Sequence, residues 1–307
     1  MIAECEQALM RKPTLQARRL DAAMLRRWSL PRPRADGDKE ARGRILVIGG
    51  SRSMPGAVIL AANAALRAGA GKLAVATVRS TATLVAVAIP ESRVIALAEA
   101  RTGWIAPAAA RSIDIEQSVD AVLVGPGMES ETAAGRFVHA LLPRVARVPN
   151  ATLVLDARAL CVVGVAAVSP FAQPVIMTPN AGELARLSGA SKDAIEAHPL
   201  EAAGRAAKRW NAVVVLKGAT TVIAAPDGRL WKHHKPNTGL AVSGSGDTLA
   251  GIIAGLAARG TPPEEAAAWG VVLHALAGEA LARRFGRLGY LARELPTEIP
   301  RLMSRLR

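Results

Sequence analysis

The stretch RILVIGGSRSMPGAVILAANAALRAGAGKLAVAT (44–77) decides the fold class of this chain. It begins with an apolar run at 44–48, which predicts a strand with both faces buried. Residues 56–68 then carry apolar side chains at helical spacing, and 73–76 is a second apolar run. A strand, a helix and a second strand in this order favour two parallel strands whose connecting helix covers one face of a sheet.

The same alternation continues along the rest of the chain. Further short apolar runs predict strands at 94–97, 121–124, 152–155, 175–177 and 213–216, and a hairpin that joins 222–225 to 229–232. Helical patterns lie at 81–87, 132–142, from 182 onward, 199–209, 263–284 and near the C-terminus. We therefore predict an α/β fold with a largely parallel central sheet and helices on both faces.

Residues 43–307 contain no break in composition and no long linker, so we expect a single catalytic domain there. Residues 1–42 show little regular hydrophobic pattern outside 20–25. The Pro-Arg-Pro-Arg segment at 31–34 predicts an extended N-terminal arm that packs either on the body or on a neighbouring subunit.

The composition is that of a folded protein, because 50% of the 307 residues are hydrophobic. Cys5 and Cys161 lie far apart in sequence and lack the spacing of a metal or redox site, so we expect reduced thiols. Residues 1–30 lack the apolar segment of a signal peptide, and no later run is long and uncharged enough to span a membrane. We expect a cytoplasmic protein with no membrane partner.

The formal net charge of +14 is typical of proteins that bind polyanions. The arginines are densest within 11–34 and 283–307, and no basic stretch alternates with aromatic residues, which make up only 3% of the chain. Proteins that bind single-stranded nucleic acid stack bases on such aromatic side chains. We therefore expect a basic exterior around a site for an anionic small molecule, and no nucleic-acid partner.

The segment NTGLAVSGSGDTLAGIIAG (237–255) carries the strongest chemical signal. The Ser-Gly-Ser-Gly run at 243–246 is small enough for backbone N–H groups to approach an anion. A predicted helix at 247–256 follows, and the N-terminus of a helix has a partial positive charge that suits phosphate. Asp247 either caps this helix and favours its dipole, or is a general base that deprotonates a hydroxyl beside an anion hole.

Polar or glycine-rich residues follow most of the predicted strands. They are Gly-Gly-Ser at 49–51, Gly-Pro-Gly at 125–127, Asp156, Thr-Pro-Asn at 178–180 and Lys-Gly-Ala at 217–219. Ligands of open α/β sheets bind at the carboxyl ends of the strands, so we expect these segments to converge on one crevice. The first of them lacks the spacing of a dinucleotide fingerprint, and is either a backbone contact for substrate or a structural turn.

Two pairs of interpretations stay open within these segments. Lys217, followed by the hydroxyls of Thr220 and Thr221, suits phosphate or ribose, but a solvated lysine explains the pattern equally well. Asn180 and Glu183 enter a helix, where they either hold Mg²⁺ through water or form an ordinary helix cap.

For two other polar residues the sequence favours a structural role. Asp156 closes the strand at 152–155, and isolated aspartates at strand ends are more often structural than functional. His274 lies in the helical pattern at 263–284, where we favour helix packing over ligand binding.

The joint order of these segments resembles the ADP-dependent NAD(P)H-hydrate dehydratases, a ribokinase-like family that repairs hydrated nicotinamide cofactors. The resemblance extends from about Gly43 to Leu302. It rests on GRILVIGGS (43–51), PGAVILAANAALRAGAGKLAVAT (55–77), IPE (89–91), VLVGPGM (122–128), LVLDARAL (153–160), TPNAGE (178–183), VVVLKGATTVIA (213–224), SGSGDTLAGIIAG (243–255) and LHALAGEA (273–280). Kinases of the same fold share the GxGD pattern but usually lack ALRAGAG, which makes the combination specific.

The resemblance implies a role for each matching residue. Asp247 corresponds to the catalytic aspartate, which also contacts substrate. The positions that correspond to nucleotide contacts or to the anion hole are Lys217, Gly218, Ala219, Thr220, Thr221, Gly244, Ser245 and Gly246. The positions that correspond to substrate contacts are Ala57, Gly125 or Gly127, and Asn180. Glu183 is the candidate ligand for Mg²⁺.

The implied reaction is the ADP-dependent dehydration of hydrated NADH or NADPH (NADHX or NADPHX), which restores NAD(P)H and releases AMP and phosphate. ADP is then a co-substrate and Mg²⁺ a cofactor. In this reaction Asp247 deprotonates the C6 hydroxyl, which attacks the terminal phosphate of ADP.

One position departs from the family. Asn180 stands where histidine is common, and the N-x-x-E pattern that it forms with Glu183 is typical of ribokinase-like small-molecule kinases. A kinase of a hydroxymethyl compound and a non-catalytic nucleotide-binding module are therefore the alternatives. The family's companion epimerase domain does not fit into residues 1–42, so we expect a separate epimerase as functional partner, and a homo-oligomer.

Overall fold

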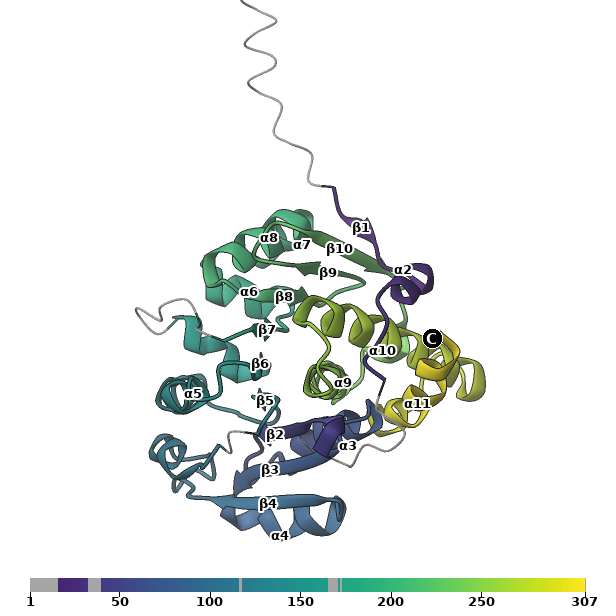
Figure 1. Ribbon diagram of the computed structural model, residues 1–307. Coiled ribbons are helices and arrows are strands. Elements are labelled where there is room, and N and C mark those ends of the chain that lie inside the picture. The colour runs from purple at the N-terminus through teal and green to yellow at the C-terminus, as the bar shows by residue number, and fades with distance from the viewer. Residues whose placement is uncertain (1–15, 33–39, 116–117, 165–170, 172, 307) are drawn as a thin grey trace, which may run out of the picture.

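The computed structural model describes residues 16–32, 40–115, 118–164, 171 and 173–306, and within them ten strands form one sheet (Figure 1). The strand order is β1-β10-β9-β8-β7-β6-β5-β2-β3-β4. The parallel strands are β2 (Arg44–Ile48), β3 (Lys72–Val78), β4 (Ser92–Leu97), β5 (Ala121–Val124), β6 (Thr152–Leu155), β7 (Val175–Met177) and β8 (Val213–Leu216). The predicted, largely parallel α/β sheet is confirmed.

An antiparallel hairpin extends the sheet beyond β8. Its strands are β9 (Thr220–Ala224) and β10 (Leu230–His234), and β9 pairs antiparallel with β8. The short strand β1 (Arg18–Arg19) pairs parallel with β10 at the edge of the sheet. The hairpin predicted from 222–225 and 229–232 is therefore present, with each bound shifted by one or two residues.

Helices cover both faces of the sheet, as predicted (Figure 1). One face is covered by α2 (Ala22–Arg27), α3 (Pro55–Arg67), α4 (Arg79–Ala88), α9 (Ser245–Ala258), α10 (Pro263–Phe285) and α11 (Leu295–Leu306). The other face is covered by η2 (Pro107–Ser112), α5 (Glu131–Val145), η3 (Ala157–Gly164), α6 (Ala181–Ser188), α7 (Lys192–Ala197) and α8 (Pro199–Trp210). In the part of the chain that the structure describes, no helix is long and apolar enough to cross a membrane.

Helix α9 lies between α3, α10 and the sheet, and it is buried nearly all round. The sequence predicts that Leu249, Ile252, Ile253 and Leu256 form an apolar stripe on one side of this helix, but nearly all of its turns are enclosed. Two glycines permit the close approach to α3: a side chain at Gly251 would lie 2.1 Å from the carbonyl oxygen of Ala61, and one at Gly255 would lie 2.5 Å from that of Ala65. This packing fixes where the N-terminus of α9 lies relative to the sheet.

The described part of the N-terminal segment, residues 16–32, packs on the body. Leu20 donates its backbone N–H to Lys232 at 2.8 Å, and the rings of Trp28 and Trp231 meet edge to face at 5.6 Å. The indole of Trp269 donates to the carbonyl oxygen of Trp28 at 2.8 Å. Residues 33 and 34 of the predicted extended arm lie outside the described residues.

Candidate active site

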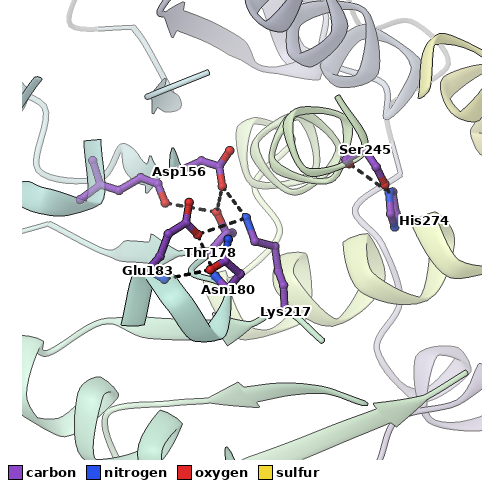
Figure 2. Close-up of polar contacts among 8 residues, drawn as sticks. Asp156, Thr178, Asn180, Glu183, Lys217, Ser245 and His274 are labelled. Carbon is purple, nitrogen blue, oxygen red and sulfur yellow. Dashed lines mark hydrogen bonds and ion pairs between the residues drawn. The ribbon is translucent and has the colours of Figure 1, made fainter. Parts of the chain in front are cut away.

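The carboxyl ends of β6, β7 and β8 lie side by side and bring three of the predicted segments together (Figure 2). Asp156 follows β6, Thr178 follows β7 and Lys217 follows β8. Asn180 and Lys217 form a parallel bridge, in which the backbone N–H of Lys217 donates to Pro179 at 2.8 Å. The segments thus meet at one edge of the sheet, as expected for an open α/β fold.

Asp156 is the centre of a polar cluster at this edge (Figure 2). Asp156 is only 2% exposed, and its Oδ1 accepts hydrogen bonds from Thr178 Oγ1 at 2.6 Å and from Lys217 Nζ at 3.0 Å. Buried carboxylates persist when they are paired and hydrogen-bonded, and Asp156 has both kinds of partner. Asp156 therefore has the structural role that the sequence favours, and it also contacts Lys217, a predicted site residue, directly.

Lys217 lies among carboxylates rather than in solvent. Burial disfavours its ammonium group, but Asp156 and Glu183 outweigh this effect and raise the pKa of Lys217 above its ordinary value. Glu183 Oε2 lies 3.9 Å from Nζ, and a side chain added at Gly246 would lie 3.6 Å from it. The ammonium group therefore stays charged at neutral pH, close to the first turn of α9.

Asp247 is the third residue of α9 and is partly buried. Burial and the negative charge of Asp156 raise its pKa to about 7, although Lys217 acts in the opposite direction. A carboxylate whose pKa lies near the working pH can accept a proton in one step of a reaction and release it in another. A role as a helix cap alone does not require a raised pKa, so this property favours the general base over the cap.

The turn before α9 is shaped by Gly244, which has a φ of +87°, in the left-handed region that glycine adopts readily. Its side-chain position faces Leu60, whose Cδ1 would lie 2.3 Å from an added Cβ, so Gly244 acts through the shape of the backbone. Among the described residues, no side chain caps the N-terminus of α9. The first turn of α9 thus lies close to Lys217, and the acidic residue within this turn is Asp247.

His274 of α10 is buried and contacts Ser245, the first residue of α9. Its Nε2 lies 3.0 Å from Ser245 Oγ and 3.1 Å from the carbonyl oxygen of Ser245 (Figure 2). Burial lowers the pKa of His274 to about 4, so the ring is neutral at physiological pH. The helix-packing role that the sequence favours is observed, and its contact is with a predicted anion-hole residue.

A cavity of about 710 Å³ opens between the loop after β8, the N-terminus of α9 and α10. Its walls include six of the predicted nucleotide-binding residues: Lys217, Gly218, Ala219, Thr221, Ser245 and Gly246. The other two lie outside its walls, because Thr220 Oγ1 is hydrogen-bonded to His234 Nδ1 at 2.7 Å and Gly244 faces Leu60. The volume is in the range of pockets that enclose small organic ligands.

Of the predicted substrate contacts other than Asp247, Asn180 lines this cavity, whereas Ala57, Gly125 and Gly127 do not. A side chain added at Gly127 would lie 3.1 Å from Cβ of Ala57, and one at Gly125 would lie 1.9 Å from the carbonyl oxygen of Asp156. Asn180 lines the cavity and caps α6.

The Gly-Gly-Ser turn after β2 is held by the protein itself. The backbone N–H of Gly49 donates to Ala76 at 3.0 Å, and that of Gly50 donates to Pro126 at 2.7 Å. Because both groups already have acceptors, the structural interpretation of this turn is favoured over a backbone contact with substrate.

Asn180 and Glu183 form a reciprocal cap at the start of α6. Asn180 Oδ1 accepts from the backbone N–H of Glu183 at 2.8 Å, and Glu183 Oε2 accepts from that of Asn180 at 2.8 Å. Within the described ranges, no group of three or more His, Cys, Asp and Glu side chains is arranged to hold a metal ion. The helix-cap interpretation is thus observed, while the role of Glu183 toward Mg²⁺ stays a prediction.

Sequence reasoning missed the contacts that Thr178, Asp156 and His274 make at the candidate site. Each carries a signal, since Thr178 and Asp156 follow apolar strands and His274 interrupts an apolar helix. Only the tertiary structure shows that Asp156 contacts Thr178 and Lys217. It likewise shows that His274 contacts Ser245, since the partners in these pairs lie between 22 and 61 residues apart in sequence.

Comparison with known proteins agrees with this geometry. The model of the NAD(P)H-hydrate dehydratase family matches residues 45–301. An ADP-dependent (S)-NAD(P)H-hydrate dehydratase of Xanthomonas campestris is 48% identical over 95% of this chain and 98% of its own length. A bifunctional NAD(P)H-hydrate repair enzyme of Moorella thermoacetica is 40% identical, and the chain spans about half of that relative (54%).

A solved structure shares the whole fold. It is the ADP/ATP-dependent NAD(P)H-hydrate dehydratase of Bacillus subtilis, co-crystallised with ATP and Mg²⁺, and it superposes with a TM-score of 0.81 over 96% of this chain and 100% of that one, at 31% identity. With the family model and the 48% identical relative, this places the chain in the NAD(P)H-hydrate dehydratase family.

Proposed function

We propose that this protein dehydrates NADHX and NADPHX in an ADP-dependent reaction and thereby restores NADH and NADPH. The observation that carries the proposal is Asp247, a carboxylate with a pKa raised to about 7 at the N-terminus of a helix, beside a lysine and a cavity of nucleotide size. The family and the X. campestris relative support this activity over the kinase alternative.

Asp247 begins the reaction by taking the proton of the C6 hydroxyl of the hydrated nicotinamide ring. The oxygen attacks the terminal phosphorus of ADP, so that a C6 phosphate ester forms and AMP leaves. The lone pair of the ring nitrogen then expels phosphate from C6, and loss of a proton from C5 restores the dihydropyridine. A base with a pKa near 7 suits the first step, because it is ionised in a large fraction of molecules and still basic enough to accept the proton.

Lys217 and the first turn of α9 stabilise the phosphoryl group while it moves. The ammonium group lies close to Gly246, and backbone donors at a helix N-terminus favour negative charge. Phosphoryl transfer depends mostly on such positioning and electrostatic stabilisation. Lys217 reaches the nucleotide cavity from the Asp156 side, so it can contact the phosphate that lies between nucleotide and substrate.

The donor set at this edge fits Mg²⁺ held mainly by water and nucleotide phosphates. Mg²⁺ usually keeps several waters and takes one or two protein carboxylates. Glu183 is such a carboxylate, three residues after Asn180; in the part of the chain that the structure describes, its Oε2 accepts from the α6 cap and lies 3.9 Å from Lys217 Nζ. When bound, the ion would neutralise part of the phosphate charge. Asn180 uses Oδ1 for its cap, so its side-chain NH₂ is the group that would donate to substrate in place of the family's histidine.

Three further properties belong to the proposal. The protein acts in the cytoplasm and assembles as a homo-oligomer. An epimerase is its functional partner, in line with the M. thermoacetica relative, which is named a bifunctional NAD(P)H-hydrate repair enzyme.

The test is incubation with NADPHX and ADP, with the recovery of reduced-cofactor absorbance and the formation of AMP measured together. We expect absorbance to recover in step with AMP and phosphate, and ADP to support a higher rate than ATP at equal concentration. A stable phosphorylated product without absorbance recovery would establish the kinase alternative. Binding of nucleotide without turnover of any hydrated cofactor would establish the other alternative, a non-catalytic nucleotide-binding module.

A further inference from the structure

A second cavity, of about 370 Å³, lies at the same edge of the sheet, between the N-terminal half of α5, η3 and α6. All three elements follow parallel strands, namely β5, β6 and β7, at their carboxyl ends. The cavity is lined by Ala157, the residue directly after Asp156, and by Glu183, which also faces Lys217. It therefore adjoins the Asp156 cluster, whereas the nucleotide cavity reaches that cluster through Asn180 and Lys217.

The walls of this second cavity carry a formal excess of one positive charge, because three arginines line it with two glutamates, Glu131 and Glu183. Three arginines line it, Arg136, Arg158 and Arg186, and two of these share one carboxylate. Arg158 pairs with Glu131 Oε1, and the Nε of Arg186 lies 3.2 Å from the same oxygen. Since one carboxylate faces two guanidinium groups, Glu131 holds the arginines in place without neutralising them.

Part of the remaining wall is apolar, and the rest is formed by Glu131, Thr132, Cys161 and Glu183. Leu160, Leu187 and Ala157 line the cavity beside the arginines. Guanidinium groups bind phosphate through two parallel hydrogen bonds, and apolar side chains accept the face of a base or sugar. A wall with both guanidinium groups and apolar side chains suits a ligand that carries phosphate groups next to an apolar surface.

The reaction proposed above needs room for two ligands that meet at Asp247. The nucleotide cavity accounts for one of them, but a hydrated dinucleotide extends beyond its reactive ring by a pyrophosphate and an adenosine. From these observations we infer that the arginine-lined cavity between α5, η3 and α6 binds phosphate of the hydrated dinucleotide, with Arg136 and Arg186 as its specificity-determining residues. This inference rests on the proposed function for the identity of the substrate.

The phosphate has two possible positions on the substrate, and they differ in a measurable way. The pyrophosphate is present in both NADHX and NADPHX, whereas the 2′-phosphate is present in NADPHX alone. Loss of a contact with the pyrophosphate weakens the binding of both substrates, whereas loss of a contact with the 2′-phosphate weakens the binding of NADPHX alone.

The test variants are Arg136→Ala and Arg186→Ala, singly and combined, because each leaves the Arg158–Glu131 pair intact. Arg205→Ala is the matched control: Arg205 is an exposed arginine of α8, and it lines a different cavity beside the turn of the β9–β10 hairpin. KM is measured for NADHX, for NADPHX and for ADP, and thermal unfolding shows whether each variant is folded.

We expect the double variant to raise KM for one or both hydrated dinucleotides by about 10- to 100-fold, the range for hydrogen bonds to charged groups. KM for ADP and the kinetics of Arg205→Ala should stay within about twofold of the parental values, the effect of a surface charge. Unchanged KM values for both hydrated dinucleotides in the folded double variant would overturn the inference.

A binding measurement separates this inference from the proposed function. NADPH carries the same phosphates as NADPHX, and its dissociation constant is measured by calorimetry for the parental protein and the double variant. If the parental protein turns over neither hydrate, the proposed function fails. In that case the binding of NADPH alone tests the cavity. A higher dissociation constant for NADPH in the double variant than in the parental protein supports a phosphate site. Equal dissociation constants in the two proteins, or no binding of NADPH to the parental protein, overturn the inference.

Discussion

Lys217 Nζ lies 3.0 Å from Asp156 Oδ1, and this pair joins the ends of β8 and β6 across the intervening strand β7. Thr178, which follows β7, donates to the same oxygen. Three neighbouring strands thus hold one ammonium group in place. Because Asp156 is nearly inaccessible to water, the lysine is positioned beside α9 before a nucleotide binds, and the charge of Asp156 is felt by Asp247.

Asp247→Asn should abolish most of the turnover. The amide retains the size of the side chain but cannot take the proton of the C6 hydroxyl, so kcat should fall by about 10²- to 10⁴-fold. The dissociation constant of ADP should stay equal or decrease, because a negative charge near the phosphates is removed. Turnover above about half the parental rate, with both substrates saturating, would show that Asp247 is structural.

The rate should depend on the ionisation of Asp247. Its raised pKa means that the carboxylate, which is the active form, is lost as the pH falls through about 7. We expect kcat/KM to rise with pH up to that value and to level off above it. The pH profile of the parental protein measures this midpoint.

Asp156→Asn should move that midpoint to lower pH. The negative charge of Asp156 is one of the causes of the raised pKa of Asp247, and Lys217, released from Asp156, would favour ionised Asp247 further. Thr178 can still donate to the amide oxygen, so the local fold should persist. A midpoint that stays in place in a folded variant would exclude electrostatic coupling between the two carboxyl groups.

Lys217→Ala should weaken the binding of ADP by about 1 to 3 kcal/mol, the range for hydrogen bonds to charged groups. It should also lower the free energy of unfolding, because Asp156 would remain buried without its cation. Lys192→Ala is the control, since Lys192 is an exposed residue of α7 whose ion pair among the described residues is with Glu196, at 3.4 Å. Equal dissociation constants for ADP in the two variants would place Lys217 outside the nucleotide site.

Asn180→Ser tests the position where the chain departs from its family. Serine caps a helix about as well as asparagine, so the thermal stability should change little, but the side-chain NH₂ is lost. We expect a higher KM for the hydrated cofactor, an unchanged KM for ADP, and recovery in Asn180→His. If only the dependence on Mg²⁺ changes, Asn180 and Glu183 act together on the ion, as in small-molecule kinases.

The sequence by itself determined the sheet and the order of its helices. Uninterrupted apolar runs such as 121–124 and 213–216 are strands with the predicted bounds, because a strand buried on both faces must be apolar throughout. Short elements escaped prediction: β1 and α7 span too few residues to show a period or an uninterrupted apolar run, and η2 and η3 were not predicted although each contains a short apolar run. The sequence also predicts a site at the glycine-rich segment 243–246 and Asp247, since small residues at the start of a helix leave backbone donors accessible to an anion, and these residues lie at the N-terminus of α9.

Only the tertiary structure decided which polar residues meet. The approach of Lys217 to Asp156, the contact of His274 with Ser245 and the gathering of three arginines around one cavity all join residues that are far apart in sequence. Hydrogen bonds and ion pairs of this kind leave no periodic pattern, because each partner needs only to lie at the correct end of its own strand or helix. The pKa of Asp247 follows from that assembly: burial and a neighbouring carboxylate set it, and neither exists until the chain has folded.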